Sequence, residues 1–257
     1  MKSDRHSRSK GKTRADGRDP LVARKIRIEP DYLDHAEGSC LISCGKTRVL
    51  CAVSVEERVP GFLEGKGKGW LTAEYAMLPR STHTRNDRES QKGKIKGRTH
   101  EIQRLIGRSL RAVVDLEALG ERTLTIDCDV IQADGGTRTT AINGAYVAVA
   151  RALNAMVKDG TLPASPLREP VGAISVGLVD GQLLVDLAYG EDSRAEVDAN
   201  FVMTGSGGIV EVQGTAEGRT FSRRELNRMV DAAWNSIEEI KAIQMAAIRK
   251  RRRPASE

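Results

Sequence analysis

The segment Asp134–Thr140, with the sequence DGGTRTT, constrains this chain more than any other stretch. It directly follows a strand-like run and opens a helix-like one, and it turns through two adjacent glycines. Glycines let the backbone come close to a ligand, and the amide groups at a helix start point at it with the positive end of the helix dipole behind them. With the guanidinium of Arg138, the segment predicts a site for a phosphate-sized anion.

This anion site is not a P-loop, because no Gly-Lys-Ser/Thr follows the glycines at the required spacing. The anion can therefore be something other than the tail of a bound nucleoside triphosphate.

Apolar periodicity predicts the elements around the segment. Alternating apolar residues indicate a half-buried strand over Thr123–Ala133. Helical spacing predicts one helix from Thr99, a second after the glycines, and a third from Ser222 to about Ile248. Ser222 and Glu225 have the spacing of a capping box at the start of the last helix.

Turn signals predict three hairpins, over residues 38–55, around 180–181 and around 205–208. Residues 60–97 contain many Gly, Lys and Arg and little periodicity, so we expect a long loop there. This order favours an α+β fold, with mixed β-sheets packed with α-helices, over a doubly wound parallel sheet.

The chain carries a formal net charge of +6, which favours polyanionic partners. Its basic residues fall into an N-terminal cluster, a middle cluster from Arg80 to Arg111, and a C-terminal run. We expect residues 1–18 to be a flexible basic arm, 19–247 a single domain and 248–257 a basic tail.

Other classes of protein are disfavoured. No run approaches the roughly 20 apolar residues of a membrane span, and the N-terminus lacks the apolar core of a secretory signal. The four cysteines form no Cys-x-x-Cys pair, so we expect reduced thiols, no zinc site and a cytoplasmic location.

Three carboxylates follow in the second half of the chain. Asp186 ends a strand-like run, Asp192 lies in a connection, and Asp198 starts the next strand-like run. If the two strands pair, Asp192 and Asp198 meet at one end of the sheet, where their natural partner is a hard cation such as Mg²⁺. An anion site, a divalent ion and a basic surface together predict phosphoryl transfer on a nucleic acid, with the attacking nucleophile left open.

Longer motifs resemble the RNase PH family from about Arg18 to about Ala247. The matching runs are GWLTAEY at 69–75, MLPRSTHTR at 77–85, GRT at 97–99, EIQRLI at 101–106, DCDV at 127–130, QADGGTRT at 132–139 and EVQGTAEG at 211–218. Polynucleotide phosphorylase, a larger relative, has a lysine where this chain has Asn200, which favours RNase PH.

The resemblance implies a phosphate-dependent 3′→5′ exoribonuclease that trims tRNA precursors and other RNA 3′ ends. Inorganic phosphate would release nucleoside diphosphates, and the reverse reaction would add nucleotides. It implies a phosphate site that consists of Arg98, Gly136, Thr137 and Arg138. Asp192 and Asp198 would bind Mg²⁺ and serve the chemistry.

The same resemblance implies a fold like the second domain of ribosomal protein S5, assembled as a homohexamer, a trimer of dimers. We expect Arg80, Arg85 and Arg88 to contact the RNA backbone from the long loop. Two alternatives remain: a non-catalytic RNA-binding ring subunit, and a hydrolytic metal-dependent nuclease. The first predicts loss of phosphate or metal ligands, and the second predicts activity without phosphate.

Overall fold

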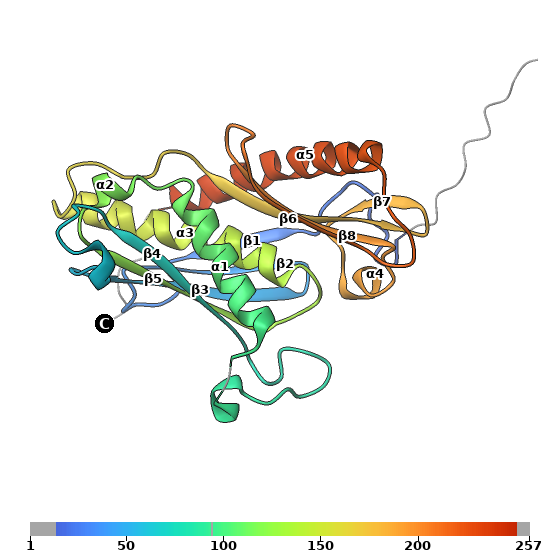
Figure 1. Ribbon diagram of the computed structural model, residues 1–257, viewed down its shortest axis with the longest axis horizontal. Helices are drawn as coiled ribbons and strands as arrows, with labels where there is room; N and C mark the ends of the chain where they lie inside the picture. Colours follow the sequence, from blue (N-terminus) through green and yellow to red (C-terminus); the bar gives the residue numbers. More distant parts are fainter. Residues whose placement is uncertain (1–13, 94, 251–257) are drawn as a thin grey trace, which may run out of the picture.

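The computed structural model describes residues 14–93 and 95–250, which fold into two β-sheets with helices packed on them (Figure 1). This arrangement confirms the predicted α+β class. Within the described residues, no helix combines the length and the apolar character that a membrane span needs.

The first sheet has the strand order β1-β2-β3-β5-β4. Its strands are β1 (Ile26–Pro30), β2 (Gly38–Cys44), β3 (Thr47–Glu56), β4 (Trp70–Met77) and β5 (Thr123–Gln132). Neighbours are antiparallel except β4 and β5, which run parallel. β5 leads directly into the glycine segment, so the sheet fixes where that segment starts.

Two helices cover this sheet: α1 (Gly97–Arg111) lies against β4, and α3 (Thr137–Lys158) lies against β2 and β3. A Cβ atom on Gly144 of α3 would lie 2.6 Å from the Ile42 side chain and 2.7 Å from Cys51 Sγ. Glycine is needed there because α3 approaches the sheet so closely. A short helix, α2 (Leu116–Leu119), precedes β5.

The second sheet has the order β7-β6-β8-β9 and is antiparallel throughout. Its strands are β6 (Val171–Val179), β7 (Gln182–Val185), β8 (Val197–Thr204) and β9 (Ile209–Ala216). The four-residue helix α4 (Tyr189–Asp192) connects β7 to β8, and the long helix α5 (Arg223–Ile248) packs on β6. The three predicted hairpins are therefore present as β2–β3, β6–β7 and β8–β9.

A buried amide joins the two sheets. Asn143 on α3 donates to the Ala173 carbonyl and accepts from the Ala173 amide, each at 2.8 Å, so it pairs with β6 like a strand residue. Gln244 on α5 donates to the carbonyls of Asn143 and Val171. Because the Asn143 amide is buried and both its oxygen and its nitrogen are paired, it fixes the orientation of the two sheets.

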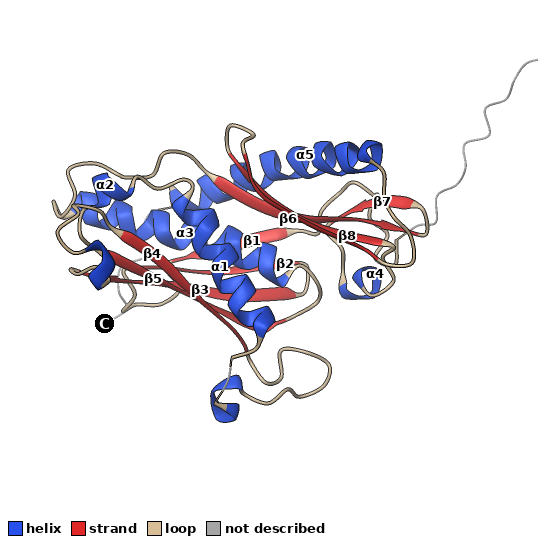
Figure 2. Cartoon of the chain, viewed as in Figure 1, coloured by secondary structure: helices blue, strands red, loops and turns tan. Residues whose placement is uncertain are grey.

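The predicted long loop was wrong in part. Residues 60–97 contain strand β4 and two short 3₁₀ helices, η1 (Gly61–Leu63) and η2 (Glu89–Lys92). Only the stretch between β4 and α1 is a long connection, and Figure 2 shows it projecting beside the start of α1. The sequence analysis also missed β1, whose five residues end in a proline.

The expected flexible arm is wrong for its last residues. Arg14 is only 6% exposed and makes hydrogen bonds to α4 and to the end of β7. The folded region therefore begins by residue 14 rather than 19. The rest of the expected arm, residues 1–13, and most of the expected tail, 251–257, lie outside the described residues.

Candidate active site

The glycine segment has the predicted strand-to-helix geometry. Gly135 and Gly136 have φ values of +77° and +64°, and α3 begins at the next residue. A Cβ on Gly135 would lie 2.4 Å from the Leu187 carbonyl oxygen and 2.8 Å from the Tyr189 nitrogen. Glycine thus lets the segment lie backbone to backbone against the entry to α4.

Thr137, the first residue of α3, is buried. The phenolic hydroxyl of Tyr75, on β4, donates a hydrogen bond of 2.9 Å to Thr137 Oγ1. Because Thr137 Oγ1 accepts this bond, its own hydrogen is free to be donated to an anion. Thr139 Oγ1 instead donates to the Gly136 carbonyl at 3.0 Å and closes the first turn.

Arg138 is held by two other elements. Its Nη1 donates to Gln213 Oε1 on β9 at 2.8 Å and to Glu101 Oε1 on α1 at 3.1 Å. Gln213 also donates to Glu101, so the three side chains form a closed triangle. Within the described residues, Nε and Nη2 of Arg138 make no hydrogen bond, which leaves those donors for a ligand.

Arg98, the second residue of α1, is exposed. Burial raises the pKa values of Asp192 and Asp198, and the positive charges of Arg98 and Arg138 oppose that rise. The charges of both predicted arginines therefore act on both predicted aspartates.

The aspartates reach this place differently from the expectation. β7 and β8 do not pair, because β6 lies between them. Asp198 instead lies on β8 opposite Gly177 of β6, and Asp192 is the last residue of α4 rather than part of an open connection. The α4 turn carries Asp192 back toward β8.

Burial and the negative charge of Asp192 raise the pKa of Asp198 to about 6, against the opposing charges of Arg138 and Arg98. Loss of water also raises the pKa of Asp192, although much of its side chain is exposed. The charge of Asp192 raises the proton affinity of Asp198, so the two carboxylates form a site that disfavours a second negative charge.

The carboxylate pair fits a divalent cation. Asp198 Oδ1 is buried and has no hydrogen-bond partner, so a hard cation would satisfy an otherwise orphaned oxygen. No group of three or more metal-ligating side chains gathers anywhere in residues 14–93 and 95–250. Mg²⁺ is commonly held by one or two carboxylates, with water and phosphate oxygens completing its shell.

Arg80, Arg85 and Arg88 are exposed in the connection between β4 and α1. Arg80 donates to the His83 carbonyl at 2.9 Å, and Arg85 donates to Asp87 at 3.2 Å. Arg88 lies close enough to Asp129 to lower its pKa, although burial and Asp127 raise it overall. Within the described residues, none of these arginines contacts the anion site.

The connection between β4 and α1 nevertheless comes close to the site at His83. The ring centroids of His83 and Tyr189 are 6.1 Å apart, so the connection lies beside α4.

The sequence analysis missed four buried charged residues behind this site: Arg14, Arg24, Asp186 as an ion-pair partner, and Glu191. Arg24 pairs with Asp186, and Arg14 pairs with Glu191. The partners lie 162 and 177 positions apart in the chain, so no local pattern could have linked them.

Comparisons with known proteins identify the family. The model of domain 1 of the 3′ exoribonuclease family, RNase PH, matches residues 23–153, and the model of domain 2 matches residues 169–236. The chain belongs to the RNase PH family. It is 59% identical over 231 residues to the Ribonuclease PH of Moorella thermoacetica, covering 90% of this chain and 92% of that protein.

Solved structures share the RNase PH fold. Rice Rrp46 has a TM-score of 0.74 at 20% identity, with 92% of this chain and 100% of that one covered. An Archaeoglobus fulgidus exosome chain, solved with RNA bound to the active site, has a TM-score of 0.75 at 21% identity, with 90% and 92% covered. At these identities the likeness concerns the fold alone.

Family membership confirms the function that the sequence resemblance implied. The chain is a phosphorolytic 3′→5′ exoribonuclease and nucleotidyltransferase of tRNA processing.

Proposed function

We propose that Arg98, Gly136, Thr137 and Arg138 bind the inorganic phosphate that attacks the RNA 3′ end; together they are called the phosphate cradle. The observation that carries this proposal is that the charges of Arg98 and Arg138 act on Asp192 and Asp198, while the glycine segment lies backbone to backbone against the entry to α4. The arginines and the free Thr137 hydroxyl match the charge and the acceptors of a phosphate ion. In this proposal the neighbouring phosphodiester enters beside the two aspartates.

The reaction exchanges one P–O bond for another. A phosphate oxygen forms a bond to the phosphorus of the terminal nucleotide, and the bond from that phosphorus to the preceding 3′ oxygen breaks. The proton of hydrogen phosphate ends on the new 3′ hydroxyl, and a nucleoside diphosphate leaves. The cradle orients phosphate in line with the breaking bond, and such positioning supplies much of the acceleration in phosphoryl transfer.

We further propose that Asp192 and Asp198 hold Mg²⁺. When bound, the ion neutralises charge on the phosphoryl oxygens. The support is the unpaired buried oxygen of Asp198 and the mutual repulsion of the two carboxylates.

The remaining assignments are proposals as well: an RNA path along Arg80, Arg85 and Arg88, a homohexamer built as a trimer of dimers, a cytoplasmic location and a single catalytic domain. The exposure of the three arginines supports an RNA path, because exposed guanidinium groups bind phosphates without reading sequence. The likeness to chains of an archaeal exosome core, at a TM-score of 0.70, supports assembly into a ring, and light scattering tests it.

One assay tests the proposed chemistry. A tRNA with a short 3′ extension is incubated with Mg²⁺, with and without phosphate, and the released mononucleotide is identified. We expect nucleoside diphosphates, formed only with phosphate. Nucleoside monophosphates, or release without phosphate, would instead identify a hydrolytic nuclease. RNA binding without any release would identify a non-catalytic ring subunit.

A further inference from the structure

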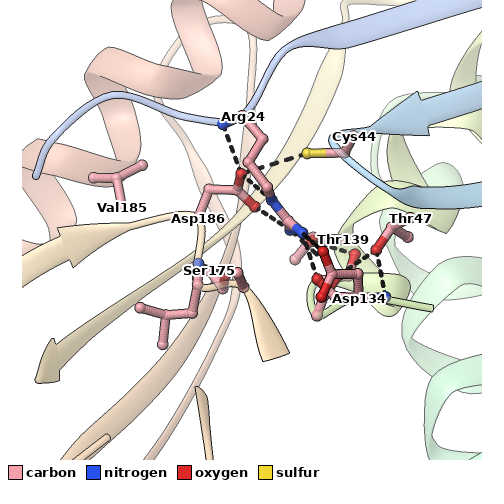
Figure 3. A network of polar contacts seen from close by, with 12 residues as sticks. Arg24, Cys44, Thr47, Asp134, Thr139, Ser175, Val185 and Asp186 are labelled. Carbon is pink, nitrogen blue, oxygen red and sulfur yellow. Dashed lines mark hydrogen bonds and ion pairs between the residues drawn. The ribbon is translucent and has the colours of Figure 1, made fainter. Parts of the chain in front are cut away.

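Behind the phosphate cradle, the guanidinium of Arg24 forms a fork with the carboxylate of Asp186 (Figure 3). Nε donates to Oδ2 at 2.8 Å and Nη2 donates to Oδ1 at 2.7 Å. The backbone amide of Arg24 adds a third bond to Oδ2 at 2.7 Å. Asp186 directly follows β7, so this fork ties the segment before β1 to the second sheet.

The other edge of the same guanidinium contacts the glycine segment. Arg24 Nη1 donates to the Asp134 carbonyl, and Nη2 donates to the Gly135 carbonyl at 3.3 Å. Thr47 holds the same segment from β3, because it donates to the Gly135 carbonyl at 2.7 Å and accepts from the Asp134 amide at 2.9 Å. One guanidinium therefore joins the loop that starts the phosphate cradle to the residue that follows β7.

Arg14 makes a second connection of the same kind to α4. Its Nε and Nη2 donate to the two carboxylate oxygens of Glu191 at 2.7 and 2.5 Å. Its Nη1 and Nη2 donate to the carbonyls of Val185 and Asp186 at 2.8 and 2.9 Å. Glu191 immediately precedes Asp192, so Arg14 anchors the turn that carries the proposed metal ligand.

These ion pairs are buried, with side-chain exposures of 5% for Arg24 and 2% for Asp186. Burial alone would raise the pKa of Asp186, but the hydrogen bonds and charge of Arg24 keep it below the ordinary value. A buried ion pair is a poor source of stability compared with apolar packing, because both charges lose their water. The role of these buried ion pairs is therefore better explained by the geometry that they impose on the site.

The backbone at Asp186 points the same way. Its φ is +55°, a left-handed conformation that costs energy for a residue with a side chain. That strained backbone directs the carboxylate into the fork with Arg24.

We propose that Arg24 and Asp186 are positioning residues that fix the spacing between the phosphate cradle and Asp192. Arg14 and Glu191 hold the far end of the same connection. None of the four touches the reacting atoms in this scheme; they set where phosphate stands relative to the carboxylate pair. This inference rests on the proposed function.

Arginine is required because one side chain must satisfy both partners. The planar fork of Arg24 reaches two carboxylate oxygens and two carbonyls at once, which a lysine ammonium cannot do. The variant Arg24→Lys keeps the charge and removes the fork. It therefore separates position from electrostatics.

The test measures kcat, the KM for phosphate and the Kd for RNA in Arg24→Lys, with melting temperature as a check on folding. We expect kcat/KM for phosphate to fall at least about tenfold, because a displacement of about 1 Å can cost about 100-fold. RNA affinity stays at the wild-type level, since the fork makes no hydrogen bond or ion pair with the arginines of the proposed RNA path in the described part of the chain. A purely structural role would lower stability without this selective loss.

The matched control is Arg151→Lys. Arg151 also forms a fork, partly buried, with Asp31, and its Nη1 donates to the Ile248 carbonyl at 2.8 Å. It lies roughly 20 Å along α3 from Arg138, at about 1.5 Å per residue. We expect a comparable loss of melting temperature and an unchanged KM for phosphate.

The outcomes are distinct. If the wild type depends on phosphate and folded Arg24→Lys has unchanged kinetics, this inference alone is overturned. Equal kinetic losses in Arg24→Lys and Arg151→Lys overturn it as well. Wild-type activity that ignores phosphate overturns the proposed function and this inference together. If Arg24→Lys fails to fold, Arg14→Lys is measured in the same way, and an unchanged KM for phosphate and kcat there overturns the inference.

Discussion

Tyr75 and Thr137 are joined by a hydrogen bond of 2.9 Å in which the phenol donates and the threonine accepts. The bond crosses from the parallel strand β4 to the first residue of α3. It fixes the direction in which the threonine hydroxyl can donate, toward the proposed phosphate rather than toward the sheet.

The variant Tyr75→Phe tests this orientation. Losing the phenol leaves the Thr137 hydroxyl free to turn away, so we expect the KM for phosphate to rise while RNA affinity stays constant. The free energy of unfolding should fall by about 1 kcal/mol, the usual contribution of one hydrogen bond. Tyr146→Phe is the control, because Tyr146 lies on the helix that carries Thr137 but outside the phosphate cradle. It should leave the KM for phosphate unchanged.

Asp192→Asn should abolish turnover with little change in fold. The amide keeps the shape of the carboxylate but loses the charge that the proposed Mg²⁺ requires, so we expect a loss of about 100-fold or more in single-turnover rate. Circular dichroism and RNA binding should match the wild type. Turnover close to normal would remove Asp192 from the catalytic residues.

Arg138→Ala and Arg98→Ala should weaken the use of phosphate far more than RNA binding. Both remove positive charge from the phosphate cradle, so initial rates at varied phosphate should show a raised KM. Arg108→Ala serves as the comparison. Arg108 lies on the helix that carries Arg98, but it pairs with Glu211 and is not part of the phosphate cradle. An equal loss of RNA affinity in the two cradle variants would contradict their assignment.

Gly135→Ala should disable the site through shape alone. The added carbon would meet the Leu187 carbonyl at 2.4 Å in a left-handed backbone, so the glycine segment must move away from α4. We expect a lower melting temperature and a strong loss of kcat. In contrast, Gly61→Ala places its carbon in open space and should behave as the wild type in both measurements.

The predicted capping box of α5 gives a pH-dependent test. Hydrogen bonds from the Ser222 backbone and side chain, with help from Arg219, lower the pKa of Glu225 from 4.5 to about 2. A depressed pKa stabilises the folded state above the unfolded pKa, and this stability is lost as pH falls through the folded value. The melting temperature of Glu225→Gln should therefore lie below the wild type at pH 7, and the difference should vanish toward pH 2.

How much of this molecule the sequence predicts depends on the range of the interactions. The Ser222 cap, the β2–β3, β6–β7 and β8–β9 hairpins and the glycine turn follow from neighbouring residues. Strand β4 was missed for two reasons. Its buried residues Leu71, Ala73 and Tyr75 alternate, but the apolar Ala76 on the opposite face interrupts that pattern. The strand is also flanked by basic, glycine-rich sequence typical of a loop. Its pairing partner, β5, lies far along the chain and is parallel, so no hairpin turn announces it.

The site divides in the same way. The glycine segment and the spacing of the carboxylates predicted the anion site and the aspartate pair, and the motif resemblance added Arg98. Neither pointed to the side chains behind them. Arg14 lies in a basic, polar stretch whose local sequence resembles a solvated arm, and Arg24 lies just after it. Only folding brings Glu191 and Asp186 to them, so their burial could not be read from composition.

The division of the chain between the two family models has a practical consequence. The proposed phosphate ligands all lie within residues 23–153, and both aspartates lie within 169–236. A cut in the connection between α3 and β6 would give two fragments, each holding half of the reaction centre. Each fragment should be inert by itself, and activity regained on mixing would measure their complementation. The hydrogen bonds between Asn143 and Ala173 would then join the two fragments.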